Sequence, residues 1–271
     1  MIEHITSKSR FHDIVWSELE GRITPREIRR HVQLACVLEP VAEKEGCTTR
    51  STNLSKYQKL EYFLTAGVNI GDAFEDLAHR IYNNGFPCQT YDLCYRAQAD
   101  SKKNRRGGRI NQGIIEFLFP LVISHVSYQL SSPHDIIQAV PAILNKTMPE
   151  DTLWLQKMQN LAFEMSGYSH RTFAPQEDTN ILSYYKRRLK DSIKPSDTYH
   201  NHEIVTNYPT LRFMIEQLSC CSTDSLSQSM QYVYNEVHRK KPEMPLGIIA
   251  DLTACLIYLK LGCERTSKLV R

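Results

Sequence analysis

The sequence GIIEFLFPLVISHVSYQL, from Gly113 to Leu130, is apolar on almost all sides when it is projected as a helix. A helix on a protein surface keeps one polar face, whereas a helix in the middle of a bundle does not. This segment therefore predicts a buried central helix around which other helices pack.

Helix signals recur on both sides of this segment. Thr24-Pro25-Arg26-Glu27 combines an N-cap, a proline at the first helical position and a glutamate that can reach back, and it predicts a helix to about Leu38. The same cap spacing begins at Ser132 and at Thr147, each time before apolar residues at helical intervals. One further helical stripe consists of Tyr62, Phe63, Ala66, Ile70, Ala73, Phe74 and Leu77.

Strand signals are nearly absent, and the alternation at 91–95 is too short to outweigh the helices. We therefore predict an all-α fold, a single-domain multi-helix bundle over residues 1–271 with roughly eight to ten helices. Irregular loops are expected near 40–56, 83–110, 166–180 and 194–208, and long loops in a compact helical domain are often functional.

Composition is that of a folded globular protein. The 271 residues include 33 Lys+Arg and 30 Asp+Glu, a net charge of +3, and 41% are hydrophobic, which excludes collagen-like and disordered classes. Residues 1–16 contain no apolar run, and the apolar stretches 114–126 and 246–261 are interrupted by charged or polar residues. We expect neither a leader nor a membrane span, and a cytoplasmic protein. The eight cysteines form no CxxC pair, which favours reduced thiols packed as small hydrophobes.

Five cations stand directly before the predicted central helix: Lys102, Lys103, Arg105, Arg106 and Arg109. Glycines at 107 and 108 and the positive end of the helix dipole favour an anion pocket here, and a di- or triphosphate fits that chemistry. A solvated basic loop is the alternative interpretation. Nucleic acid is a weaker one, because no aromatic residues are interleaved with the cations.

Acidic and histidine side chains form the other candidates. Asp72 shares a helix face with Glu75 and Asp76, an arrangement that suits Mg²⁺ beside substrate phosphates, although a solvated acidic face has the same spacing. His200 and His202 alternate as metal ligands in an extended segment do, but surface histidines are the simpler interpretation.

Taken in order, several segments resemble the triphosphoribosyl-dephospho-CoA synthase family. Residues 33–46, QLACVLEPVAEKEG, are similar to its opening helix and Pro-Lys-Pro-Gly turn, with Glu43 and Glu45 in place of the prolines. Residues 109–121, RINQGIIEFLFPL, are similar to its Asn-Thr-Asn-x-Gly turn and apolar helix, with Arg109 and Ile110 substituted. The resemblance covers roughly residues 31–215 and includes 63–75, 149–151, 176–178 and 191–211.

The resemblance implies a helical single domain and a transferase. Such an enzyme attaches the ribosyl-triphosphate of ATP to an acceptor hydroxyl, of dephospho-CoA or an analogue, and releases adenine. Displacement at ribose C1′ is helped by carboxylates near the sugar, and the triphosphate by cations and Mg²⁺. The residues matched to these roles are Glu39, Asp72 and Asp178 for catalysis; Lys44, Gly46, Arg106, Arg109, Asn111 and Gly113 for substrate and phosphate; and Glu75 and Asp76 for the metal.

The substituted turns motivate an alternative of another class. In it, a catalytically altered member keeps the fold as a nucleotide-binding sensor or a partner-binding module. The expected partners are ATP and a small-molecule acceptor, with a homodimer as a candidate assembly, and neither nucleic acid nor a membrane.

Overall fold

The computed structural model describes residues 22–167, 176 and 178–268, and within these ranges it is all-α, without a named strand. The predicted fold class is confirmed. Residues 1–16 and most of the loop predicted at 166–180 lie outside the described residues. The elements are α2 (Pro25–Leu38), the 3₁₀ turn η1 (Glu39–Val41), α3 (Leu60–Asn69), α4 (Gly71–Asn84), α5 (Tyr91–Asp100), α6 (Gln112–Tyr128), α7 (Pro133–Asn145), α8 (Pro149–Met165), α9 (Ile181–Lys190), α10 (Pro195–Val205), α11 (Pro209–Ser219), α12 (Leu226–Lys240) and α13 (Leu246–Lys268).

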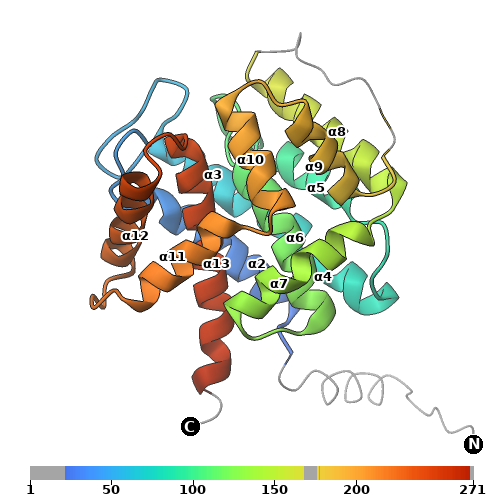
Figure 1. Cartoon of the computed structure of the whole chain (residues 1–271). Coiled ribbons are helices and arrows are strands. Elements are labelled where there is room, and N and C mark those ends of the chain that lie inside the picture. Colours follow the sequence, from blue (N-terminus) through green and yellow to red (C-terminus); the bar gives the residue numbers. More distant parts are fainter. Residues whose placement is uncertain (1–21, 168–175, 177, 269–271) are drawn as a thin grey trace, which may run out of the picture.

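The central helix is α6, as its sequence predicts (Figure 1). Every residue from Ile114 to Val126 is buried, and α4, α5, α7 and α13 pack around it. Buried apolar side chains from all these helices join in one continuous core. The core thus follows from the predominantly apolar character of α6 on almost all its sides.

The second long apolar helix is α13, which contacts α2, α6, α11 and α12. Its window Leu246–Cys263 is long and apolar enough to cross a membrane by length and composition, although the sequence predicts no membrane span there. Within the fold, 61% of that window is buried, and a core helix passes the same test of length and composition.

Two of the three predicted helix caps are confirmed. Thr24 Oγ1 accepts from Glu27 N at 3.2 Å and the Glu27 carboxylate accepts from Thr24 N at 2.9 Å, which completes a capping box at α2. Ser132 Oγ accepts from Asp135 N at 3.5 Å at α7.

The cap predicted at Thr147 is wrong. Met148 is the N-cap of α8, and its N–H donates to Asp151 Oδ2 at 3.0 Å. Thr147 Oγ1 instead accepts from Ile181 N at 2.8 Å and so ties the start of α8 to that of α9.

Two predicted loops contain helices. The segment 83–110 contains α5, whose first N–H groups are capped by a residue far along the chain: Asp151 Oδ1 accepts from Thr90 N at 2.8 Å and from Tyr91 N at 2.9 Å. The segment 194–208 contains α10, which begins with Pro195. The stripe over 62–77 is divided at Ile70 into α3 and α4.

The eight cysteines are all free, as predicted. Four of them are buried, three are half-buried and Cys220 is exposed; the buried ones are Cys36, Cys47, Cys94 and Cys255. The thiols therefore contribute mainly as small apolar side chains.

Candidate functional site

A pocket of about 320 Å³ opens where the start of α6 meets η1, α10 and α13. This volume falls within the range of small-molecule sites. The lining residues come from segments far apart in the sequence, and those with polar or charged side chains include Glu39, Thr48, Arg109, Asn111, Gln112, Glu116, Gln159, Arg188, Ser196, Asp197, His200, Asn201 and Asp251.

Six of the residues singled out from the sequence line this pocket: Glu39 and Gly46 from the first segment, Arg109, Asn111 and Gly113 from the second, and His200. The two segments that carry the family resemblance therefore meet. The guanidinium of Arg109 lies over the ring of Phe163, 5.6 Å from its centroid, and this contact orients the cation.

Asn111 has an unusual position at the start of α6. It is the N-cap in a left-handed conformation, φ 61°, yet its side chain makes no capping hydrogen bond. Both amide atoms are buried without a partner among the described residues. An unpaired buried amide costs free energy, so a side chain held this way is a marker of a binding site rather than of a stabilising cap.

Lys44 lies beside the pocket but is occupied. Its ammonium is 3.1 Å from Glu39 Oε1 and also donates to the backbone carbonyls of Glu39 and Ala42, 3.0 Å for Ala42. Both side chains are buried. The two side chains thus form an internal ion pair. The Lys44 ammonium is bound by Glu39 and two carbonyls rather than being directed into the pocket.

The basic run at 102–109 is folded on itself. Lys102 donates to the carbonyl of Gly107, and Arg105 donates to those of Ser101 and Gly108, 3.0 Å for Gly108. Burial lowers the pKa of Arg105 to about 10. Arg106 borders a separate surface depression, with residues of α3. Of the five cations in this run, Arg109 is the one that reaches the pocket.

The predicted acids of α4 lie outside the pocket. Asp72 and Glu75 pair with Arg29 at 3.1 and 3.0 Å, and Asp76 pairs with Arg96. In the described part of the chain, no group of three His, Cys, Asp or Glu side chains is arranged to hold a metal ion.

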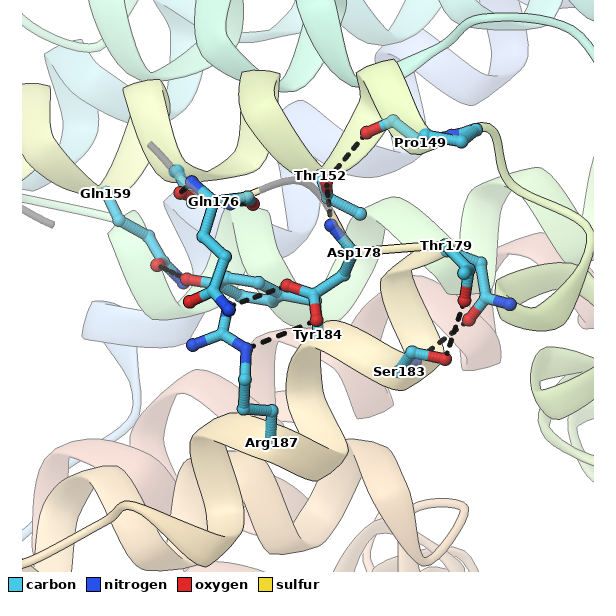
Figure 2. Close-up of polar contacts among 11 residues, drawn as sticks. Pro149, Thr152, Gln159, Gln176, Asp178, Thr179, Ser183, Tyr184 and Arg187 are labelled. Carbon is cyan, nitrogen blue, oxygen red and sulfur yellow. Dashed lines mark hydrogen bonds and ion pairs between the residues drawn. The ribbon is translucent and has the colours of Figure 1, made fainter. Parts of the chain in front are cut away.

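Asp178 is also outside the pocket. Figure 2 shows its carboxylate turned toward Arg187, with Oδ2 2.6 Å from Nη2 and Oδ1 3.2 Å from Nε. The Asp178 N–H donates to Thr152 Oγ1 at 3.3 Å. The segment before α9 is thus tied to α9 through Arg187 and to α8 through Thr152.

The pocket is also lined by a carboxylate that the sequence did not predict, that of Glu116. Glu116 accepts hydrogen bonds from Gln112 Nε2 (2.5 Å), Gln159 Nε2 (2.8 Å) and Tyr185 OH (2.9 Å), and His200 Nε2 is 3.2 Å away. Burial raises the pKa of Glu116, but His200 and the amide donors outweigh burial and hold it at about 2. Glu116 is therefore ionised at neutral pH.

The prediction for His200 is corrected by this network. His200 and His202 lie on α10 rather than in an extended segment, and the His200 side chain is 16% exposed instead of being a surface histidine. Its ring stacks on Phe117 with centroids 4.3 Å apart. Gln159, which also binds Glu116, accepts from Tyr184 OH (Figure 2).

A second missed acid, Asp251, enters from α13. A Cβ built on Gly113 would lie 2.7 Å from Asp251 Cγ and nearer still to Oδ2, so the carboxyl fills the space beside the first turn of α6. Burial and the neighbouring Glu39 raise the pKa of Asp251 to about 7, against the opposing effects of His200 and Arg109. The signal for both missed acids is a single carboxylate within an apolar helix.

Comparisons with protein-family models, with curated proteins and with solved structures found no match to this chain. The chemistry of the pocket is therefore argued from its own residues. It combines two carboxyl groups of opposite protonation tendency, Glu116 and Asp251, with the cation of Arg109 and the unpartnered amide of Asn111.

Proposed function

We propose that this chain is a ribosyl-type transferase that binds ATP in the pocket, transfers its ribosyl-triphosphate to an acceptor hydroxyl and releases adenine. The acceptor is dephospho-CoA or an analogue of it. The observation that carries the proposal is the meeting of residues 39–46 and 109–113 in one pocket, because these are the two turns that resemble the synthase family.

The lining residues suit this reaction. Displacing a base from C1′ passes through a state with positive charge on the ribosyl ring, as in glycoside hydrolysis, and an ionised Glu116 stabilises such charge. Arg109 supplies a cation for phosphate oxygens, and the Asn111 amide offers a donor and an acceptor to a base or a ribose.

Mg²⁺ enters this proposal with the nucleotide. The described residues do not provide a metal site of three protein ligands, and Asp72, Glu75 and Asp76 are paired with arginines. Magnesium is commonly held by substrate phosphates and water. We therefore treat MgATP as the substrate.

The test is a turnover assay on the full chain with ATP, MgCl₂ and dephospho-CoA, read by mass spectrometry. The expected products are free adenine and the acceptor with a ribosyl-triphosphate attached. The assay is then repeated with related alcohols in place of dephospho-CoA, and with other purine triphosphates in place of ATP. Adenine or another base released from none of these pairs contradicts the proposal.

Replacing Arg109 tests the phosphate contact. Arg109→Ala should weaken nucleotide binding by roughly 10- to 150-fold, because a charge-assisted contact is worth about 1.5–3 kcal/mol. Arg106→Ala is the matched control, since Arg106 borders a separate depression. Equal affinities for the two variants in calorimetry would remove Arg109 from the site.

The second candidate function is a nucleotide sensor or partner-binding module that does not turn over. It is favoured by the Lys44 ammonium, which is held by Glu39 and two carbonyls in the turn that resembles Pro-Lys-Pro-Gly. A ligand that binds only the folded state raises its stability by mass action. Thermal stabilisation by ATP without release of adenine would support this candidate over the transferase.

A further inference from the structure

The Asp251 carboxyl stands apart from the other acids of the molecule. It is the one acidic residue in the apolar window Leu246–Cys263 of α13. It lines the pocket, and no hydrogen bond or ion pair to it is found among the described residues. The side chain is half-buried on the wall of the pocket, so its carboxyl is open to a ligand there.

The space for this carboxyl is built into the neighbouring helix. Gly113 lies in the first turn of α6, where any side chain would collide with the Asp251 carboxyl. Alanine is a better helix former than glycine by about 1 kcal/mol. Glycine at this position therefore makes room for the Asp251 carboxyl but lowers the stability of the helix.

The charged groups near Asp251 come from three other elements and from the segment before α6. Glu39 belongs to η1, Arg109 precedes α6, Glu116 belongs to α6 and His200 to α10. The charge of Asp251 also contributes to the raised pKa of three nearby thiols, those of Cys36, Cys47 and Cys255. Burial, together with the charges of Glu39 and Glu116, raises the pKa of Asp251 against the opposing effects of His200 and Arg109, and so favours a proton on this carboxyl.

We propose that Asp251 is the catalytic acid that protonates the departing base, while Glu116 remains ionised and stabilises the ribosyl group. This assignment rests on the proposed transferase function. The C1′–N9 bond breaks with its electron pair on adenine, and the Asp251 proton passes to a ring nitrogen of that base. The acceptor oxygen forms the new bond to C1′, its proton goes to water, and Asp251 recovers a proton from water.

The surroundings explain why Asp251, rather than its neighbours, carries the proton. Glu116 has four donors that favour its ionised form, and Glu39 has Lys44. The pKa of Asp251 is about 7 and that of Glu116 about 2, the separation expected of an acid and an electrostatic partner. A catalytic acid is most effective when its pKa is near the working pH.

Asp251→Asn tests the assignment. Base release should fall by roughly 10²- to 10⁴-fold, the usual contribution of an acid, while ATP affinity stays close to that of the unmodified chain. In the unmodified chain the rate should decline as the pH rises above about 7, because the acid then loses its proton, and the variant should lack that decline. Asp224→Asn, on an exposed loop, is the matched control with an unchanged rate and pH profile.

Infrared difference spectroscopy provides a readout that does not need turnover. The unmodified chain should show a protonated-carboxyl band that disappears with a midpoint near pH 7 and is absent from Asp251→Asn. Asp251→Ser replaces the asparagine variant if that variant does not fold. A missing band, or a variant that keeps the rate or the pH profile, overturns the assignment. If the unmodified chain shows this carboxyl band but releases no base, the transferase function and the catalytic role of Asp251 are both overturned. The protonation of Asp251 itself is then still supported.

Discussion

At the scale of single residues, the partner of a side chain decides what the side chain does. Lys44 has the residue type and the neighbouring glycine of a phosphate contact, yet it is 5% exposed and paired with Glu39, which is 3% exposed. Removing one member of a buried pair leaves a charge without compensation, which is worse than removing both.

Lys44→Met should therefore lower the free energy of unfolding by about 3–5 kcal/mol, measured by urea denaturation at pH 8. Burial raises the pKa of Glu39 and Lys44 opposes this, so without Lys44 the folded state holds the Glu39 proton more firmly than the unfolded chain does. Stability then falls as the pH rises through that pKa, and the loss should be smallest near pH 4.

The double variant Lys44→Met with Glu39→Gln is the control for this pair. It should recover much of the lost stability, because no buried charge is then left alone. Unchanged stability of Lys44→Met, combined with weaker nucleotide binding, would show that Lys44 contacts the nucleotide after all.

At the scale of elements, the site depends on how the start of α6 packs against α13. At the start of α6, the N-cap Asn111 is left-handed and Gly113 has no side chain, and Asp251 of α13 fills the space beside Gly113. These features concern one contact between two helices, so substitutions across it should not be additive.

Gly113→Ala should lower the melting temperature and the rate of base release, because its Cβ displaces the Asp251 carboxyl. In an Asp251→Ala background the same substitution should be neutral or stabilising, since alanine is the better helix former. Thermal unfolding of the four proteins of this cycle gives the coupling. Equal effects of Gly113→Ala in both backgrounds would argue against contact between the two positions.

Sequence predicts those elements whose signals are local. The capping box at Thr24 and the apolar run of α6 act within a few residues, and both helices were predictable. The start of α5 is capped by Asp151, sixty residues away, so the residues near α5 do not predict where this helix begins. The same holds for Asp251, whose place in the pocket depends on how α13 packs on α6.

At the scale of the whole molecule, the pocket draws together the first and the last parts of the described chain. Glu39 follows the first helix, whereas Asp251 lies beyond residue 215, where the family resemblance ends. In Figure 1, α13 lies beside α2, the first helix of the described residues, and the two are in contact. One ligand in this pocket should therefore affect segments that are remote in sequence at the same time.

Hydrogen exchange with and without a non-hydrolysable ATP analogue and Mg²⁺ measures this effect. Exchange should slow together in residues 42–59, 109–116 and 245–251, because a bound ligand opposes local opening of every segment that it touches. Residues 102–106 and 72–76 should be unchanged, since they lie at other surfaces. Arg109→Ala at the same analogue concentration should show little protection anywhere. Protection confined to 102–106 or to 72–76 would instead place the nucleotide at Arg106 or at the acids of α4, and would separate it from Asp251.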